Sequence, residues 1–580
     1  MLRFSTRSFF ILLISAISLY ILAHNALTSE PFTVRSISTF NPCNRLEIST
    51  AHNSFSNRLQ QVECIVDGST RYQCISDGTD VYFPFDKFLK KRFDISGKHS
   101  KNISKNRTVF EWSTSYAKIR LPDSAPYDPF GAFGHFAQYS VETRDRVRCI
   151  NGKFGVPMSV QWQAEPYFYP IQIAQYALQH YSRNKTGGSE WRISVGNSQS
   201  DWNIHDNVRL SITFSHDLAT FVTSLKAKGL SGSAELRLNS DTSLNIVSFK
   251  WMPQGLASFT VRVRLVEFQS DVLLNYILKN DSRCVWFDPK ASATSYNYAL
   301  DYQPISSDWN YIVRDILVDT GRAISSTSSP KHKLSSQPHP GDISLVSITF
   351  RGNLSLYGLQ QRSSAHMDHF FTGAEWLLSN QDSRGGWPVP AERSIADKRL
   401  ILKAGWHSAM AQGHALSVLT RAYGVTKDEK FLQSAARALA LFRTPVSEGG
   451  IRNELFGHAW YEEYPTTPGT YVLNGFMYSL IGLYDFMSVN HEQSVEAEKL
   501  FKDGLSSLIK FLPLFDTGSG SIYDLRHIGL QTAPNLARWD YHAVHIYLLK
   551  WLFNLTKRKE LDDVAVRWIS YAKGHRAKHN

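Results

Sequence analysis

The spacing of apolar residues changes near residue 360 of this 580-residue chain, and the change limits what the chain can fold into. Between about 190 and 355, segments such as 208–214 (VRLSITF) and 259–265 (FTVRVRL) alternate apolar and polar residues. Because successive side chains of a strand point to opposite faces, this alternation predicts an antiparallel sandwich or barrel. After 360, apolar residues recur at helical spacing, as at Phe501, Leu505 and Leu508, and predict helices.

A chain of this length exceeds one hydrophobic core, so we expect a multidomain α+β protein. About seven helices between 365 and 573, joined by loops, favour an (α/α) helical toroid. One earlier helix is predicted at 167–180, and Thr426 with Glu429 forms a predicted capping box. The predicted domains are a stem at 24–80, an N-terminal β-rich domain with β-hairpins at 81–155, a β-sandwich or barrel domain at 156–359 and a C-terminal (α/α)-barrel catalytic domain at 360–580.

The first residues have the pattern of a membrane anchor. Arg3 and Arg7 precede an apolar run, so we predict a cytoplasmic tail (1–8), a transmembrane signal anchor (9–23) and a luminal remainder. A cleaved signal peptide is the alternative, because the run is short. Asn-x-Ser/Thr sequons indicate a secretory route and a glycoprotein; they begin at Asn102, Asn106, Asn184, Asn280, Asn353 and Asn554.

Charge narrows the choice of partner. Lys and Arg number 63 against 51 Asp and Glu, a formal net charge of +12. A basic protein favours nucleic acid, a membrane surface or an acidic polysaccharide. Because a luminal chain does not meet nuclear nucleic acid, an acidic glycan is the expected partner.

The cysteines do not indicate a metal site or a catalytic thiol. Cys43, Cys64, Cys74, Cys149 and Cys284 form no CxxC pair and no Cys/His metal spacing. We expect one local disulfide among the first three. The odd count leaves at least one thiol free or paired between chains.

Three short stretches near the C-terminus combine carboxylates, tyrosines and arginines: 460–468 (WYEEYPTTP), 517–526 (TGSGSIYDLR) and 533–542 (APNLARWDYH). Removing the C5 proton of a uronic acid places negative charge beside an existing carboxylate. A site for this reaction must neutralise that carboxylate and place a base on one face of the sugar. Epimerisation also requires a proton donor on the opposite face. No metal or redox cofactor is required if arginine and tyrosine side chains do the neutralising.

Glu463 is the candidate base, and we expect the neighbouring carboxylate of Glu462 to raise its pKa. Tyr464, Tyr523 and Tyr541 are candidate hydrogen-bond or proton donors. Arg526 can clamp a carboxylate with its planar fork. Each residue also has a structural interpretation: a tyrosine beside proline packs a loop, and Asp524 with Arg526 forms a surface pair.

These stretches resemble the heparan sulfate D-glucuronyl C5-epimerase family. The resemblance runs from about residue 139 to the C-terminus and includes 144–149 (RDRVRC), 167–176 (YFYPIQIAQY), 385–388 (GGWP), 405–413 (GWHSAMAQG) and 474–484 (NGFMYSLIGLY). It implies conversion of D-glucuronate to L-iduronate within N-sulfated heparosan, in heparan sulfate and heparin biosynthesis. It further implies a type II Golgi membrane protein, a homodimer and an association with heparan sulfotransferases.

By this resemblance Glu463 and Tyr541 are the opposed proton-transfer pair, and Tyr464, Tyr523 and Arg526 hold the carboxylate. The residues that fall in substrate-lining segments of the family are Tyr139, Arg144, Asp145, Arg146, Gln161, Tyr169, Gln172, Gln175, Arg393, Asn474, Tyr478, Asn535, Arg538, Trp539 and His542.

The family resemblance also implies a structural calcium ion in the β domain, with an acidic ligand just before the sequon that corresponds to Asn353. This chain has Gly352 at that position, and the 197–202 region is shortened, so we do not expect calcium here. His542 and His545 have no acidic partner in sequence and are not expected to bind a metal.

Two other functions compete with epimerisation. A uronate polysaccharide lyase would remove the same proton and then eliminate the 4-linked chain. A non-catalytic glycan-binding protein would keep the fold without turnover. Intact Glu463, Tyr523, Arg526 and Tyr541 favour an enzyme over the second alternative.

Overall fold

The computed structural model describes residues 59–66, 70–90, 96–102, 107–113, 119–123, 125–205, 208–228, 232–300, 308–326, 339–537 and 539–578. The chain divides into two compact units, Met1–Ala117 and Lys118–Asn580. The division falls inside the range 81–155 that was predicted to be one β-rich domain. The predicted tail and anchor (1–23) lie outside the described residues. Within the described part, no helix has the length and apolar content to cross a membrane.

The first unit is built from short antiparallel strands. β1 (Gln60–Val66), β2 (Thr70–Ser76) and β3 (Val81–Tyr82) form one sheet, and β4 (Ser96–Asn102) pairs with β5 (Arg107–Ser113). Residues 60–76 lie within the predicted stem and form this hairpin, because alternating apolar residues such as Val62 and Cys64 allow strand pairing despite many polar neighbours.

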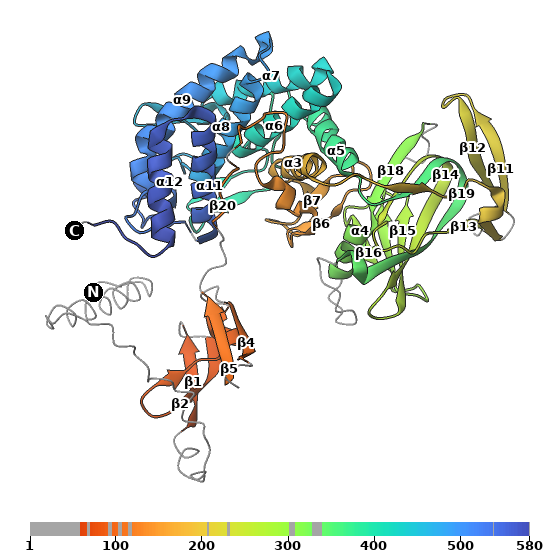
Figure 1. Ribbon diagram of the computed structural model, residues 1–580, viewed down its shortest axis with the longest axis horizontal. Helices are drawn as coiled ribbons and strands as arrows, with labels where there is room; N and C mark the ends of the chain where they lie inside the picture. Colours follow the sequence, from red (N-terminus) through yellow and green to blue (C-terminus); the bar gives the residue numbers. More distant parts are fainter. Residues whose placement is uncertain are drawn as a thin grey trace. The chain divides into compact units, whose positions relative to one another are not determined.

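The β domain of the second unit is organised by two long paired strands (Figure 1). β14 (Ile246–Leu265) and β19 (Ile343–Arg362) are each 20 residues long and antiparallel, and register shifts interrupt their pairing. Such irregularities let strands bend. Alternate β14 residues, including Phe259 and Val261, are fully buried in the core. The predicted alternating strands are therefore confirmed.

Nine further strands complete this sheet within the described residues. The main order is β10-β13-β19-β14-β15-β17-β16; β9 and β12 also pair with β19, β18 pairs with β14, and β11 pairs with β12. Their bounds are β9 (Arg192–Ser194), β10 (Trp202–His205), β11 (Val208–Ser215), β12 (Thr220–Ala227), β13 (Ser233–Arg237), β15 (Ser270–Ile277), β16 (Val285–Phe287), β17 (Ser295–Ala299) and β18 (Asn310–Asp315).

Helices form the rest of the second unit. After residue 365 the described residues hold seven helices of at least 14 residues, which confirms the helical pattern; they are α5 (His366–Ser379), α6 (Ala409–Thr426), α7 (Glu429–Arg443), α8 (Leu473–Met487), α9 (Val495–Phe511), α11 (Trp539–Thr556) and α12 (Lys559–Ala572). Several helices that follow one another in sequence pack together, as Figure 1 shows for α11 with α12 and α8 with α9. Closure into a toroid stays a prediction.

The helix predicted at 167–180 is present as α3 (Pro170–Thr186). Although it precedes the β domain in sequence, it packs on α5 and α6. The predicted capping box is wrong. Thr426 ends α6, with its hydroxyl donating to the Ala422 carbonyl, and Asp428 caps α7 by accepting from the Lys430 amide at 3.1 Å.

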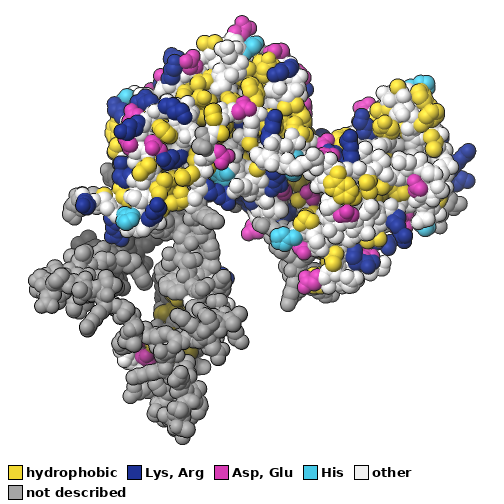
Figure 2. All heavy atoms as spheres, in the orientation of Figure 1, with side chains coloured by type: hydrophobic (Ala, Val, Ile, Leu, Met, Phe, Trp, Pro, Cys, Tyr) yellow, Lys and Arg dark blue, Asp and Glu magenta, His cyan; other side chains and the backbone are white. Residues whose placement is uncertain are grey.

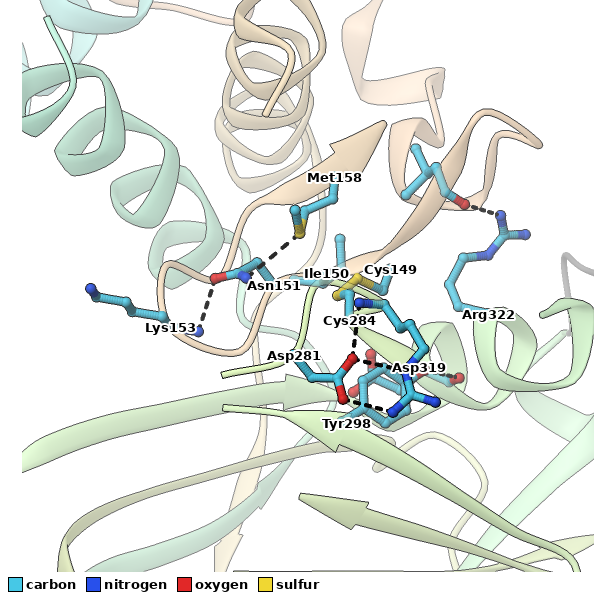
Figure 3. The surroundings of a disulfide bond; sticks show 12 residues. Cys149, Ile150, Asn151, Lys153, Met158, Asp281, Cys284, Tyr298, Asp319 and Arg322 are labelled. Carbon is cyan, nitrogen blue, oxygen red and sulfur yellow. Dashed lines mark hydrogen bonds and ion pairs between the residues drawn. A yellow bond between two sulfur atoms is a disulfide. The ribbon is translucent and has the colours of Figure 1, made fainter. Parts of the chain in front are cut away.

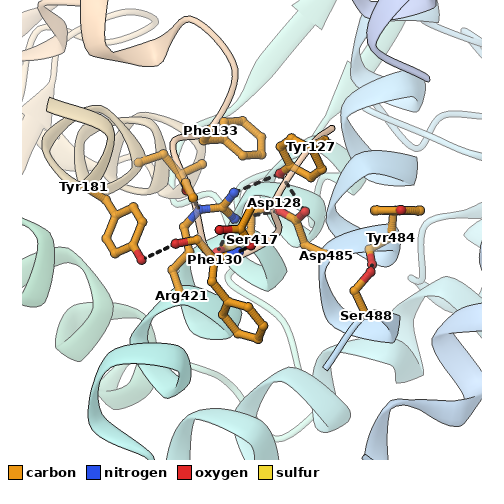
Figure 4. Close-up of polar contacts among 12 residues, drawn as sticks. Tyr127, Asp128, Phe130, Phe133, Tyr181, Ser417, Arg421, Tyr484, Asp485 and Ser488 are labelled. Atoms are coloured by element: carbon orange, nitrogen blue, oxygen red, sulfur yellow. Dashed lines mark hydrogen bonds and ion pairs between the residues drawn. The ribbon is translucent and has the colours of Figure 1, made fainter. Parts of the chain in front are cut away.

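A buried ion pair fixes the chain segment that leads into the helical domain (Figure 4). Arg421 of α6 donates to Asp485 of α8 at 2.7 Å, and neither side chain is exposed to solvent. Tyr127 donates to the same carboxylate at 2.7 Å, and Arg421 donates to the Gly131 carbonyl at 3.0 Å. These contacts hold the segment from Tyr127 onward against two helices, just before the residues predicted to bind substrate.

A disulfide joins two distant parts of the second unit (Figure 3). It links Cys149 of β6 (Val147–Ile150) to Cys284, the residue before β16, 135 positions later. The expected local disulfide does not form between Cys64 and Cys74, which are free. In the hairpin Cys64 stands opposite Tyr72, not opposite Cys74. Cys43 lies outside the described residues.

Candidate active site

Glu463 lies on the loop between β23 (His458–Tyr461) and α8, with 4% of its surface exposed. Its carboxylate packs on the first turn of α8, where a Cβ added to Gly475 would lie 2.3 Å from Oε2. That oxygen has no hydrogen-bond partner among the described residues. Burial raises the pKa of Glu463 to about 7, while a Tyr464 hydrogen bond and the charge of Arg393 lower it. A carboxylate with this pKa suits a general base near neutrality.

Glu462, one residue earlier, has a structural role, because its carboxylate is bonded to the surrounding loop. Its carboxylate is fully buried and accepts hydrogen bonds from Asn453 Nδ2 at 3.0 Å, Thr470 Oγ1 at 3.1 Å and the Tyr471 amide at 2.9 Å. These bonds close the loop that carries Glu463. The expected cause of the raised Glu463 pKa is corrected: burial dominates, and the carboxylate that contributes is Asp524, not Glu462.

Tyrosines gather around the Glu463 carboxylate. Tyr523 of β24 (Ile522–Asp524) and Tyr541 of α11 have ring centroids 4.7 Å apart. Burial first, and the Glu463 charge second, raises the pKa of Tyr464, Tyr523 and Tyr541 above that of free tyrosine. Their hydroxyls therefore stay protonated at neutral pH and can donate. Tyr541 is 39% exposed, so its side chain also reaches solvent.

Arg526 is held in place by a buried carboxylate. Its Nε lies 3.1 Å from Asp524 Oδ1, and Asn535 Nδ2 donates to Asp524 Oδ2 at 2.7 Å. Asp524 is 2% exposed, so the pair is not the plain surface pair considered from sequence. This pair sets the direction of the Arg526 guanidinium, whose side chain is 21% exposed.

Arg393 of the helical domain and Arg146 of the N-terminal part of the second unit add positive charge to the same site. Arg393, at the start of β20 (Arg393–Ile395), lies over the rings of Trp162 and Tyr464, 5.0 and 5.6 Å from their centroids. Arg146 Nη1 donates to Gln161 Oε1 at 3.4 Å. The charges of Arg146 and Arg393 lower the pKa of Tyr169, opposing the effect of its burial. The structure thus brings residues 146–169 to the Glu463 region.

Two tryptophans belong to this site although the sequence did not single them out. Trp162 stands edge-on to Tyr169 at 5.0 Å and lies 5.9 Å from Trp406, whose ring is 5.7 Å from Tyr464. Trp162 is partly exposed, whereas Trp406 is buried and donates its indole N–H to the Ala391 carbonyl at 3.0 Å. A signal was present, since Trp162 follows Gln161 and Trp406 lies in the 405–413 run.

A second group of predicted residues lies around Arg144. Its Nη1 donates to Gln175 Oε1 at 2.7 Å, and its guanidinium lies 5.4 Å from the ring centroid of Tyr139. Tyr478 of α8 is buried beside Tyr139, and burial raises the pKa of both hydroxyls. The hydrogen bond between them lowers the pKa of Tyr139 and raises that of Tyr478. Buried side-chain atoms without partners are uncommon and often mark functional sites; here they are both amide atoms of Gln172 and Oδ1 of Asn474.

The remaining predicted residues are not brought into either group. Asp145 is exposed and faces a separate cavity that Arg148 and Arg322 also line. His542 contacts the Ser521 hydroxyl through Nδ1 at 2.8 Å and the Trp568 carbonyl through Nε2 at 3.1 Å, which supports packing. Arg538 lies outside the described residues, and Trp539 begins α11.

Two positions of the β domain bear on the calcium site that the resemblance implies. Gly352 offers no side-chain ligand, and a Cβ there would lie 2.2 Å from the Leu256 carbonyl oxygen. The Asn353 side chain accepts a hydrogen bond from the Ala227 amide at 2.8 Å. Among the described residues, no group of three or more His, Cys, Asp or Glu side chains could hold a metal ion.

The buried Glu463 carboxylate, the neutral tyrosines and the arginines beside them define a proton-transfer enzyme on a β-domain plus helical-domain fold. Two family models match: the D-glucuronyl C5-epimerase C-terminus over residues 381–570, and the D-glucuronyl C5-epimerase beta-sandwich domain over residues 218–353. The chain is 46% identical over 557 residues to D-glucuronyl C5-epimerase of Caenorhabditis elegans, covering 89% of each chain. The chain therefore belongs to the D-glucuronyl C5-epimerase family, and its β domain is a sandwich.

More distant likenesses add little. An uncharacterized protein of Methanocaldococcus jannaschii is 35% identical over 164 residues, covering 27% of this chain and 49% of that protein. A solved family 11 carbohydrate-binding module of a Clostridium thermocellum cellulase covers 30% of this chain and 95% of its own, at 10% identity and a TM-score of 0.19. An overlap this low supports neither a fold nor a ligand assignment.

Proposed function

We propose that this chain converts D-glucuronate to L-iduronate within N-sulfated heparosan, as a step in heparan sulfate and heparin biosynthesis. Family membership and 46% identity to a D-glucuronyl C5-epimerase support C5-epimerase activity. The observation that carries the chemistry is the Glu463 carboxylate: it is buried, has a pKa of about 7, and has no hydrogen-bond partner at Oε2 among the described residues. Such a group can accept a proton from a weak carbon acid.

In the proposed mechanism, Glu463 removes the C5 proton and the C–H electron pair moves into the sugar carboxylate. Arg526, Tyr464 and Tyr523 stabilise the resulting enediolate with a positive charge and neutral hydroxyl donors. Tyr541 then gives its hydroxyl proton to C5 from the opposite face, which forms the new C–H bond. Its phenolate regains a proton from water, because Tyr541 is 39% exposed. Glu463 releases the proton taken from C5 to water, so both groups return to their starting states and the reaction consumes no proton.

The polymer itself would be held by positive charge. Arg144, Arg146 and Arg393 lie around the predicted site, and Figure 2 shows Lys and Arg side chains spread over the visible face of the helical domain. We further propose that the protein is a homodimer on the luminal side of the Golgi membrane, held by the anchor at 9–23 and associated with heparan sulfotransferases. No cofactor is proposed for the chemistry.

Proton exchange tests this function. The purified chain is incubated with N-sulfated, non-epimerised heparosan in deuterated water, and the polymer is analysed by NMR. Deuterium at C5, iduronate signals and an unchanged chain length are expected. Unsaturated chain ends would instead identify a lyase, and bound polymer without exchange would identify a glycan-binding protein.

A further inference from the structure

One buried arginine of the β-sandwich holds the main chain of the segment that carries Arg144 and Arg146. Arg322 belongs to α4 (Ile316–Ser325) and is 2% exposed. Its Nη1 donates to the carbonyl oxygens of Arg144 and Val147, each at 2.9 Å, and its Nη2 donates to that of Thr143 at 3.1 Å. Figure 3 shows Arg322 reaching from α4 toward this segment. A planar guanidinium thus fixes three carbonyls around one turn.

Apolar packing joins α4 to residues on either side of the turn, because Val318 lies in one buried cluster with Val141 and Ile150. A cavity of about 260 Å³ lies beside the turn; its lining includes Asp145, Val147, Val160 and Arg322. At residues 143–147 the hydrogen bonds of Arg322 therefore add a polar contact with α4 to the apolar contact made by Val318. Hydrogen bonds from a charged donor are the stronger kind.

Helix α4 is a rigid base for Arg322. Asp315 caps its first turn by accepting from the Val318 amide at 3.1 Å. Asp319 accepts from the Tyr276 hydroxyl at 2.6 Å and from Arg314 Nη2 at 2.7 Å, so the helix is tied to β15 and β18. All of these groups are at least partly buried. The sheet therefore fixes the position of α4, and with it the position of Arg322.

Two further contacts join the sandwich to the strand that follows the turn. Arg314 Nη2 donates to the Ile150 carbonyl at 3.1 Å, and the Cys149–Cys284 disulfide lies on the same strand, β6. These contacts hold β6, which begins after Arg146. Arg322 is the contact that reaches back to Thr143 and Arg144.

We propose that Arg322 is a positioning residue for substrate binding: through the main chain of residues 143–147 it places the side chains of Arg144 and Arg146 where the acidic polymer binds. Its guanidinium is engaged by three carbonyls and so does not itself bind the substrate. The sandwich, which contributes none of the proposed proton-transfer residues, thereby sets polymer affinity. This inference rests on the proposed function, because Arg144 and Arg146 are taken as contacts for that polymer.

The test uses full-length chains carrying Arg322→Gln, Arg322→Lys and, as a matched control, Arg351→Gln. Arg351 is a part-buried sandwich arginine whose Nη1 donates to Thr260 Oγ1 at 3.0 Å, within the sheet. KM and kcat for N-sulfated heparosan are measured, together with direct polymer binding. For Arg322→Gln we expect KM to rise about ten-fold with kcat changed less than about two-fold, the sign of lost uniform binding. The KM of Arg322→Lys should lie between the values for wild type and Arg322→Gln, since an ammonium keeps the charge but lacks the planar fork.

Equal KM values for Arg322→Gln and the control would overturn the proposal, and so would a fall in kcat at unchanged KM. If the Gln variant does not fold, the Lys variant decides by the same KM comparison. If the wild-type chain binds polymer but does not epimerise it, the proposed function fails. Polymer affinity of the Arg322 variants against the control then still tests the positioning role.

Discussion

Replacing Gly475 with alanine tests whether the packing of α8 sets the position of the catalytic base. An added Cβ would lie 2.3 Å from Glu463 Oε2, 2.7 Å from its Cβ and 2.9 Å from its Cδ, whereas ordinary contacts begin near 3.4 Å. Because the overlap includes Cβ, rotation of the carboxylate alone does not relieve it. The carboxylate oxygen must move by about 1 Å, a misplacement that costs roughly 100-fold in rate at an active site.

Stability should respond much less than activity. Alanine is better than glycine by about 1 kcal/mol in a helix interior, an upper limit for Gly475 in the first turn, and overpacking costs about 1–3 kcal/mol, so the two effects partly cancel. We therefore expect kcat to fall about 100-fold while the unfolding midpoint shifts by a few degrees. Turnover is followed as deuterium incorporation at C5 by NMR, and unfolding by circular dichroism.

The control is the same substitution at Gly188, where an added Cβ meets nothing within 4 Å. That variant should keep wild-type kcat. Wild-type kcat in the Gly475 variant, with the fold intact, would show that Glu463 is not the base or is not held by this helix. An equal loss of kcat in the Gly475 and Gly188 variants would contradict the explanation by contact with Glu463, because only the Gly475 variant makes that contact.

Three other predictions concern the proton-transfer pair, pH and the buried ion pair. Glu463→Gln and Tyr541→Phe should each abolish C5 deuterium incorporation while polymer affinity, measured by titration, stays within about two-fold of wild type; wild-type rates in both variants would contradict their roles. Because Glu463 acts as a base only when ionised and its pKa is raised to about 7, kcat/KM should rise with pH up to about 7 and then level off, and a profile already flat from pH 5 would contradict this. Asp485→Asn should cost about 3–5 kcal/mol of unfolding free energy in urea, because Arg421 is left as an unpaired buried charge. The exposed pair of Arg558 and Glu560 is the control, and Glu560→Gln should change stability by under about 0.5 kcal/mol.

The fold class could be predicted because strand and helix periods are local properties of the sequence. Alternation marked β14 and β19, and helical spacing marked the long helices after residue 365. Contacts between distant residues could not be predicted in this way. The Cys149–Cys284 disulfide joins residues 135 positions apart, and α3 packs with helices that follow the whole sandwich. In both cases the partner is decided by tertiary packing, which the local pattern does not contain.

The candidate site was predictable in its residue types more than in its geometry. Glu463, Tyr523 and Tyr541 stand out because carboxylates and tyrosines are concentrated in short motifs. Trp162 and Trp406 were missed because isolated tryptophans most often fill cores, and only their contacts with Tyr169 and Tyr464 reveal a site.

The two adjacent glutamates show why the geometry matters. Glu462 and Glu463 are the same residue type, both are buried, and burial raises the pKa of each. Glu462 accepts three hydrogen bonds that close the loop, so its carboxylate is occupied by structure. Glu463 keeps a free oxygen among the described residues, with Gly475 leaving the space for it. The hydrogen bonds of Glu462 therefore fix the loop, and the loop holds the Glu463 carboxylate in its buried position. The reactivity of Glu463 therefore depends on burial against α8 rather than on charge repulsion from its neighbour.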